Sequence, residues 1–227
     1  MFATVPPPPQ RLLVFARLPE PGRVKTRLAA KLGPERALAV YEAMLRDVIA
    51  SVGASSEETE IEFLWSPTPA ANGAALRKAF AHHTVAVQTG ETRGDRLSMA
   101  FSERFFFHRT QKIVAIGVDD PLLPRELIDH AFALLDSCEY AIGPAENGRY
   151  YLFGCRAMSF EPSVFQDIAW GTSSVLSHTV GRIAATGRTM ALLPERFDID
   201  TAEDLERFGA AGHDGELGRL LRGGPKR

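Results

Sequence analysis

The chain alternates short apolar segments with longer segments of helical periodicity, and this alternation constrains its fold more than any other feature. The first apolar segment, Leu12 to Ala16, is typical of a strand that is buried on both faces. The segment 34–52 then repeats apolar residues at helical spacing, with a proline at its start. Strands that alternate with helices of ten or more residues predict an α/β fold, a mostly parallel sheet with helices on both faces.

The same pattern predicts the remaining elements in chain order. Further strands are expected at 60–65, 84–88, 112–117, 139–143, 150–154 and 190–193. Further helices are expected at 69–80, around Leu97 to Phe105, at 124–135, from Trp170 to about Ala185, and after the segment 197–204. We expect one domain over 11–208, after a proline-rich leader at 1–10 and before a loosely held, glycine-rich tail at 209–227.

Composition excludes several classes of protein. The formal net charge of −2 argues against a protein that binds nucleic acid, which usually carries a basic excess. Cys138 and Cys155 stand apart without CxxC spacing, so neither a zinc site nor a disulfide framework is indicated. No apolar run approaches the length of a membrane span, and the first residues lack the pattern of a secretory signal. The sequence therefore predicts a cytoplasmic protein.

A basic loop follows the first strand directly. Its four cations crowd into eleven residues, and the only acid among them is Glu20: they are Arg17, Arg23, Lys25 and Arg27. Like charges this close repel one another unless an anion lies between them, so the loop indicates a bound phosphate or diphosphate. The alternative is a solvated basic loop without function. The Walker and dinucleotide fingerprints are absent, since Gly22 is the only glycine nearby.

Two acidic segments could hold a divalent cation. Asp119 comes directly after the central strand, where carboxylates suit a hard metal ion that would neutralise a diphosphate. The alternative is that Asp119 or Asp120 caps the helix that follows. Alternation along an extended segment would place Asp198 and Asp200 on one side, which indicates a second metal carboxylate. Capping explains Asp204 without any function.

The loop 143–151 joins the end of one strand to the start of the next. Its glycines and polar residues suit the rim of a substrate site, although a plain turn would look much the same. The six histidines show no metal spacing, and no serine stands in a GxSxG motif, so a hydrolase elbow is absent.

Four motifs together carry a resemblance to a known family. They are FARLPEPGRVKTRL, GVDDPLL, GPAENGRYYLFG, and WGTSSVL with DIDTAEDL. The chain resembles, over roughly 11–208, a bacterial family long described as a domain of unknown function and grouped with nucleotide-diphospho-sugar transferases. It is similar more distantly to 2-phospho-lactate guanylyltransferase and molybdenum-cofactor guanylyltransferase. The resemblance implies a GT-A-like fold, a Rossmann-like sheet that binds nucleoside diphosphate groups and a divalent metal.

The resemblance also implies roles for individual residues. The nucleotide-binding residues that it implies are Arg17, Gly22, Arg23, Lys25, Arg27, Gly94 and Arg96. It implies Asp119 as the first metal aspartate and Asp198 or Asp200 as the later one. The chain departs from the family pattern at two places: Asp120 replaces a cysteine, and Asn147-Gly148-Arg149-Tyr150 replaces DGGY. Arg149 brings a charge that could meet an anionic acceptor.

These observations predict a metal-dependent transferase that uses a nucleotide-activated donor. We expect a glycosyltransferase that acts from a nucleoside diphosphate sugar on a small-molecule acceptor. Lys25 and Arg27, with Arg23 and an Mg²⁺ or Mn²⁺ ion on Asp119, would stabilise the charge that develops on the diphosphate leaving group. One alternative is a nucleotidyltransferase that takes a nucleoside triphosphate and releases pyrophosphate. The other is a nucleotide-binding protein without catalytic activity.

Overall fold

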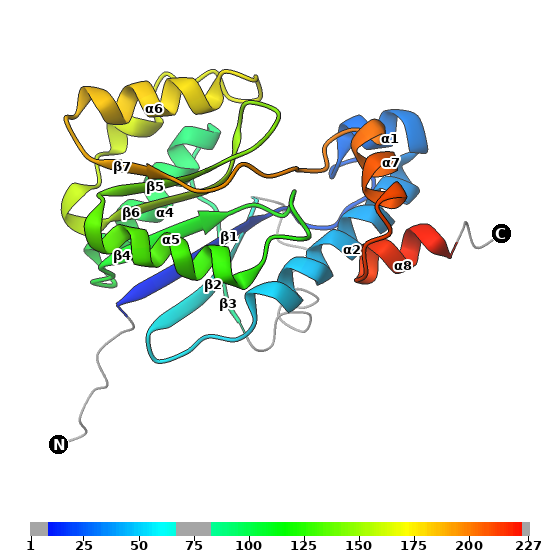
Figure 1. Cartoon of the computed structure of the whole chain (residues 1–227), viewed down its shortest axis with the longest axis horizontal. Helices are drawn as coiled ribbons and strands as arrows, with labels where there is room; N and C mark the ends of the chain where they lie inside the picture. The colour runs from blue at the N-terminus through cyan, green and yellow to red at the C-terminus, as the bar shows by residue number, and fades with distance from the viewer. Residues whose placement is uncertain (1–8, 67–82, 224–227) are drawn as a thin grey trace.

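One seven-stranded sheet forms the centre of the molecule (Figure 1). The structure, a computed structural model, describes residues 9–66 and 83–223. The strands are β1 (Gln10–Ala16), β2 (Thr59–Trp65), β3 (Thr84–Val87), β4 (Lys112–Ile116), β5 (Tyr140–Pro144), β6 (Tyr150–Arg156) and β7 (Met190–Leu192). They lie in the order β3-β2-β1-β4-β6-β5-β7, and β6 alone among them runs antiparallel to both its neighbours. The predicted mostly parallel α/β sheet is confirmed.

The central strands are apolar on both faces, as strands covered by helices must be. Leu12 of β1 pairs with Ile61 of β2 and Val114 of β4, and all three side chains are fully buried on one face. Leu13, the next residue, turns to the opposite face and is equally buried. This alternation explains why an unbroken apolar run, rather than an alternating one, marks β1 in the sequence.

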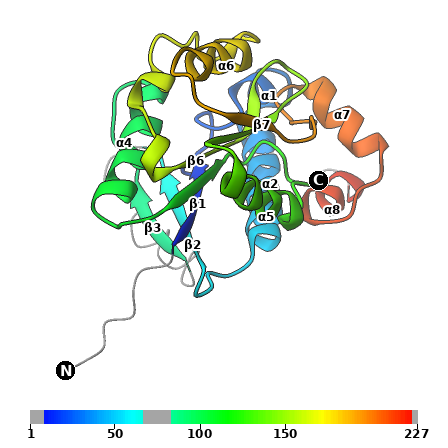
Figure 2. The same ribbon diagram turned by 60° about the vertical axis from the view of Figure 1, so that its left-hand side comes forward.

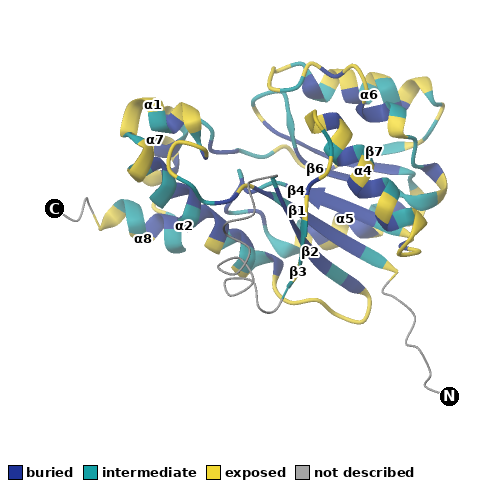
Figure 3. Cartoon of the chain, turned by 180° about the vertical axis from the view of Figure 1, so that it is seen from behind, coloured by how far each residue is buried: buried dark blue, intermediate teal, exposed yellow. Residues whose placement is uncertain are grey.

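Helices cover both faces of the sheet. One face carries α2 (Pro34–Val52) and α5 (Arg125–Ser137), and the other carries α4 (Arg93–Phe106) and α6 (Val175–Ala185). Figure 2 shows α2 and α4 on opposite sides of β1. The helices bury the side that contacts the sheet and expose the other, while the inner strands are buried nearly throughout and the edge strands β3 and β7 are more exposed (Figure 3). Each helix thus follows the amphipathic pattern expected of a covering layer.

Three shorter helices gather at one end of α2 (Figure 1). They are α1 (Thr26–Leu32), α7 (Ala202–Ala210) and α8 (Glu216–Arg222). The predicted capping box at the start of α7 is present, with Thr201 accepting from the Asp204 amide. The prediction of a loosely held tail is wrong for its described part, 209–223. Asp47 of α2 accepts hydrogen bonds from two backbone amides at the start of α8, and Leu217 is fully buried.

The other sequence predictions agree with the structure apart from a few boundaries. The predicted helix at 69–80 lies outside the described residues. The helix predicted from Trp170 begins only at Val175, because residues 170–174 form turns. The α1 helix was not predicted, since its seven residues are too few to show helical periodicity.

Candidate functional site

A cleft lies at the carboxyl ends of β1 and β4. The strand order places β2 and β3 on one side of β1 and β4 on the other, so the order of parallel strands reverses between β1 and β4. Open α/β sheets bind ligands outside the carboxyl ends of their strands at such a point. The loop after β1 lines this cleft with its four cations, and the loop after β4 lines it with residues 117–119.

Lys25 anchors the basic loop. Its backbone is left-handed, with φ 45° and ψ 50°, a conformation that costs a residue other than glycine about 1–3 kcal/mol. Its side chain is 4% exposed, and its ammonium lies 2.5 Å from Asp119 Oδ1 and 2.5 Å from the Ile199 carbonyl oxygen. A buried and paired lysine rules out the solvated-surface interpretation for this part of the loop.

The other cations of the loop remain accessible. The Tyr41 hydroxyl fixes the main chain of Arg17, since it donates to the Arg17 carbonyl and accepts from the Arg17 amide, but the Arg17 residue is exposed. Arg23 is 65% exposed and contacts Glu20 at 3.4 Å, and Arg27 lies 2.8 Å from Asp200 Oδ2. These side chains can therefore reach an anion in the cleft.

The two aspartates after β4 perform different tasks. Asp120 is buried, accepts a hydrogen bond from the Leu122 amide and pairs with Arg196 at 2.5 Å, so it holds the turn. Asp119 points to Lys25, and its side chain is 44% exposed. Since Pro124 caps α5 without a side-chain hydrogen bond, neither aspartate caps that helix. Asp119 is the carboxylate that faces the cleft.

Asp198 and Asp200 lie on the same side of their segment, as predicted, and both contact Arg149. The Arg149 Nη2 atom lies 2.8 Å from Asp200 Oδ2 and 3.4 Å from Asp198 Oδ2. The Asn147 amide donates to both oxygens of Asp198 at 2.6 and 2.7 Å. The two residues of loop 147–150 that depart from the family pattern, Asn147 and Arg149, therefore both bind Asp198.

The balance between burial and the neighbouring cations shifts the pKa values of Asp119 and Asp198 in opposite directions. Burial favours the neutral form of Asp119, but Lys25, with Arg93 and Arg149, outweighs it and lowers the Asp119 pKa. Burial dominates at Asp198, and its pKa lies above the ordinary value despite Asn147 and Arg149. The cleft thus favours the ionised form of Asp119 more than that of Asp198.

The arrangement of these aspartates does not fit the predicted metal ion. Magnesium takes oxygen ligands in near-octahedral geometry. Lys25 already binds Asp119, and Arg149 binds Asp198 and Asp200. Within residues 9–66 and 83–223, no three His, Cys, Asp or Glu side chains form a group that could hold a metal. The participation of Mg²⁺ or Mn²⁺ in the reaction stays a prediction from the sequence.

The remaining predicted residues shape the cleft rather than point a free charge into it. A side chain at Gly94 would meet the Phe165 carbonyl oxygen at 2.4 Å, so this glycine permits close packing of α4. Arg96 donates to the carbonyls of Gly90 and Glu91 and so holds the loop that enters α4. Gly22 has φ 73° and allows the basic loop to turn.

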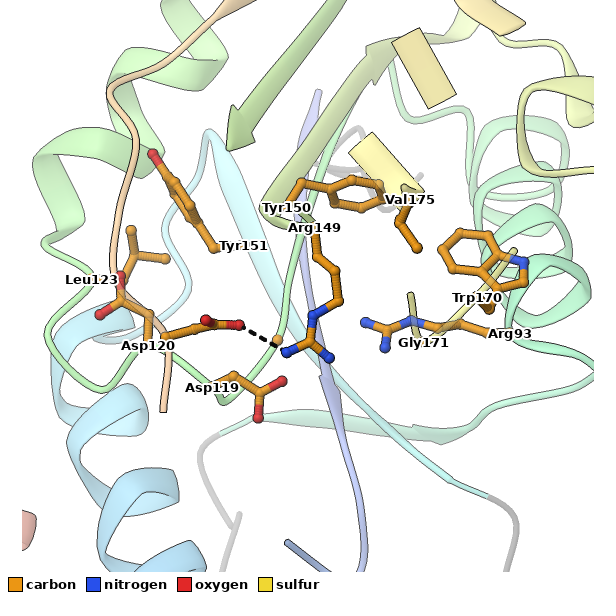
Figure 4. Close-up of a pocket in the computed structure, with 12 residues that line it drawn as sticks. Arg93, Asp119, Asp120, Leu123, Arg149, Tyr150, Tyr151, Trp170, Gly171 and Val175 are labelled. Carbon is orange, nitrogen blue, oxygen red and sulfur yellow. Dashed lines mark hydrogen bonds and ion pairs between the residues drawn. The ribbon is translucent and has the colours of Figure 1, made fainter. Parts of the chain in front are cut away.

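Arg93 is a cleft residue that the sequence interpretation missed. Figure 4 shows Arg93 and Arg149 reaching into one pocket, Arg93 from the start of α4 and Arg149 from the loop before β6, with Asp119 beside Arg149. The Arg93 guanidinium lies over the Trp170 ring, 5.8 Å from its centroid. Arg93 directly precedes Gly94 at the start of α4, so the signal was a cation in the segment that follows β3. The resemblance implied roles for Gly94 and Arg96 in this segment but none for Arg93.

Comparison with known proteins relates the chain to one family and one fold. Residues 52–172 match the family described as an uncharacterized protein conserved in bacteria (DUF2064). The crystal structure of a candidate nucleotide-diphospho-sugar transferase from Desulfovibrio desulfuricans G20 is 30% identical, with a TM-score of 0.88 and 95% of each chain covered. A search of curated proteins found no match.

More distant structures share the fold alone. The synthase of 4-diphosphocytidyl-2C-methyl-D-erythritol from Anaerococcus prevotii DSM 20548 is 10% identical with a TM-score of 0.56, over 90% of this chain and 98% of its own. The inositol-1-phosphate CTP transferase from T. maritima is 14% identical with a TM-score of 0.54, over 96% and 98%. The chain thus has a fold shared with nucleotidyltransferases. None of its described helices is long and apolar enough to cross a membrane.

Proposed function

The chain belongs to the bacterial family DUF2064, and on this basis we propose that it is a transferase that takes a glycosyl group from a nucleoside diphosphate sugar. The observation that carries the proposal is the cation-lined cleft at the reversal of strand order, with Asp119 beside Lys25. The 30% identical relative, itself a candidate nucleotide-diphospho-sugar transferase, supports a nucleotide-sugar donor.

The residues of the chain divide the work of such a site. Arg17, Arg23 and Arg27 reach the diphosphate from the open side, where charge-assisted hydrogen bonds to phosphate are strong. Lys25 is held by Asp119 and the Ile199 carbonyl, so its ammonium stays at one point as negative charge develops on the leaving diphosphate. The small acceptor would enter the same cleft beside Tyr151 and Gly171.

Nucleotidyl transfer is the second candidate function. The fold is shared with CMP:2-keto-3-deoxy-manno-octonic acid synthetase, which is 13% identical with a TM-score of 0.52 and was solved with CTP. The same cations would then stabilise a departing pyrophosphate instead of a nucleoside diphosphate. Product analysis separates the two functions, because only one of them releases pyrophosphate.

A thermal-shift panel of UDP, GDP, CDP and dTDP tests the proposal. A nucleotide at about 100 times its dissociation constant should stabilise the fold by ~2.7 kcal/mol. We expect Arg23→Ala to weaken the binding of that nucleotide by at least about tenfold, because it removes a charge-assisted contact. Calorimetric titration measures the change.

Arg219→Ala is the matched control for Arg23→Ala. Arg219 is 67% exposed and pairs with Glu216 three residues earlier, as Arg23 pairs with Glu20, but it lies on α8 and does not line the cleft. Its affinity for nucleotide should equal that of the wild type. Equal losses in the two variants, or no shift with any nucleotide, would refute the proposed donor site.

A further inference from the structure

The guanidinium of Arg149 lies where the sequence predicts a metal ion. Its Nη2 atom contacts both later aspartates, at 2.8 Å from Asp200 and 3.4 Å from Asp198. Asp119 lines the same pocket and lies beside Arg149 (Figure 4). One cationic side chain thus contacts two of the three carboxylates that were expected to surround a divalent cation and lies beside the third.

The charges around Arg149 balance without a metal. Asp119, Asp198 and Asp200 are negative, and each contacts a cationic side chain, namely Lys25, Arg149 or Arg27. A divalent cation bound by all three aspartates would have to displace Arg149 and Lys25 from carboxylates that they contact directly. Removing one partner of a buried ion pair leaves an uncompensated charge, which is strongly unfavourable.

Asn147 prepares Asp198 for this pairing. The side-chain NH2 group of Asn147 donates to both carboxylate oxygens of Asp198. The side-chain carbonyl oxygen of Asn147 accepts a hydrogen bond from the backbone amide of Arg149 at 3.1 Å. Gly148, between them, has φ 77°, and a side chain there would meet the Ser173 carbonyl oxygen at 2.1 Å. The loop therefore holds Arg149 in one place by several independent contacts.

Arg149 still has hydrogen-bonding capacity directed at the cleft. Its Nη2 atom serves the two aspartates, whereas no described residue accepts a hydrogen bond from Nε or Nη1. Arg93 enters the same pocket and forms no ion pair with a described residue (Figure 4). Arg93 is therefore an excess positive charge beside an otherwise balanced cluster. Two guanidinium groups in one pocket favour an anion between them, and phosphate oxygens match their planar donors.

We propose that Arg149, fixed by Asp198 and Asp200, acts with Arg93 as a built-in cationic pair that binds the phosphate oxygens of the donor. The pair performs the charge-neutralising task of a divalent cation, so the cleft holds a nucleoside diphosphate without metal. The identity of the ligand rests on the proposed function, whereas the replacement of the metal site by Arg149 rests on the contacts of Arg149 alone.

Calorimetric titration of the full chain tests the first part. UDP, GDP, CDP, dTDP and inorganic pyrophosphate are titrated in EDTA and again with Mn²⁺. The dissociation constant of any ligand that binds should agree within about threefold between the two conditions. Arg149→Ala should weaken binding in EDTA by at least about tenfold, since a charged hydrogen-bond donor is lost. Binding of the wild type that requires Mn²⁺ would overturn the proposal.

Titration with Mn²⁺ alone tests the second part, and it needs no nucleotide. The wild type should show no stoichiometric Mn²⁺ binding, whereas Arg149→Ala should gain a site because Asp198 and Asp200 lose their cation. A second change, Asp198→Asn, should remove the gained site. Stoichiometric Mn²⁺ binding by the wild type that Asp198→Asn abolishes, or no gain in Arg149→Ala, would overturn the proposal.

Two further variants distinguish the loss of the Arg149 contacts from a general loss of the fold. Arg149→Lys keeps the positive charge, so it should bind ligand in EDTA more weakly than the wild type and gain no Mn²⁺ site. Arg188→Ala removes another half-buried arginine that contacts two carboxylates, Glu139 and Glu161, but lies away from the cleft, and it should leave ligand affinity unchanged. If no ligand binds under any condition, the proposed function fails while the Mn²⁺ titrations still decide the role of Arg149.

Discussion

Two clusters of arginines and carboxylates lie on the sheet, and they differ in how completely their charges are matched. In the first, which we call the buried cluster, Glu62 accepts from Arg11 at 3.0 Å and from Arg104 at 2.6 and 2.9 Å. These three side chains are 3–5% exposed. In the second, the cleft cluster, Arg149 contacts Asp198 and Asp200 but stays partly accessible.

The difference separates a structural role from a binding role. In the buried cluster both oxygens of the central carboxylate are used, and neither arginine faces a described pocket. In the cleft cluster the donors that remain face the site where we place the phosphates. The same residue types thus stabilise the fold in one place and bind a ligand in the other, according to whether their remaining donors face a pocket.

The largest expected effect is on the buried cluster. Glu62→Gln removes the buried carboxylate that Arg11 and Arg104 share and leaves them only the more exposed Glu60 and Glu103, so we expect a loss of about 3–5 kcal/mol in the free energy of unfolding. Urea denaturation measures it. Glu60→Gln is the control, because Glu60 is more exposed and contacts Arg11 alone among the arginines, and it should cost less than about 1 kcal/mol. Equal costs would mean that burial does not distinguish the two glutamates.

The matching change in the cleft cluster should cost less. Asp198→Asn keeps the shape of the side chain, and Arg149 retains its shorter contact with Asp200. Burial already raises the pKa of Asp198, so a neutral amide relieves part of the cost of a buried charge. We expect a loss of about 1–2 kcal/mol in the same urea experiment. A loss of stability as large as that of Glu62→Gln would mean that both clusters have a structural role.

The smallest expected effect is a dependence of stability on pH. Burial would raise the pKa of Glu62, but Arg104 and Arg11 outweigh it, so its pKa in the folded protein lies below the ordinary value of 4.5. The folded state then binds this proton less readily than the unfolded state. The stabilisation from Glu62 is therefore present above pH 4.5 and is lost as the pH falls through the lower, folded-state pKa.

Melting temperatures from neutral pH to pH 3 check this sign. The wild type should lose stability below about pH 4.5 more steeply than Glu62→Gln, since that variant has no carboxyl at position 62 to protonate. Parallel curves for the two proteins would show that Glu62 titrates alike in the folded and unfolded states.

The fold and much of the cleft could be predicted from the sequence because both depend on local patterns. Apolar runs marked the strands, and the motif after β1 correctly indicated a loop at the carboxyl end of the sheet. The tail could not be predicted, because its order comes from Asp47, about 170 residues away in the chain. The glycines of the tail suggested a flexible backbone, whereas contacts with α2 give the tail a defined structure.

The carboxylates that each cation contacts could not be predicted from the sequence for the same reason. The three arginines and one lysine of the basic loop looked alike in the sequence. In the structure, however, Lys25 is buried against Asp119, whereas Arg23 is open to solvent. Arg149 suggested an acceptor contact, but in the structure it binds Asp198 and Asp200. Spacing shows which charges reach the same edge of the sheet, while pairing depends on side-chain packing between segments far apart in the chain.

The contact between Lys25 and the Ile199 carbonyl oxygen joins residues 174 positions apart and sets the order in which the site can be completed. All seven described strands lie before residue 193, so a nascent chain released only that far from the ribosome contains every segment of the described sheet. Such a chain lacks the segment that supplies Ile199, Asp198 and Asp200, and its basic loop has no carboxyl-terminal partner. The protein therefore completes its binding site only after the last described strand of its sheet has been synthesised.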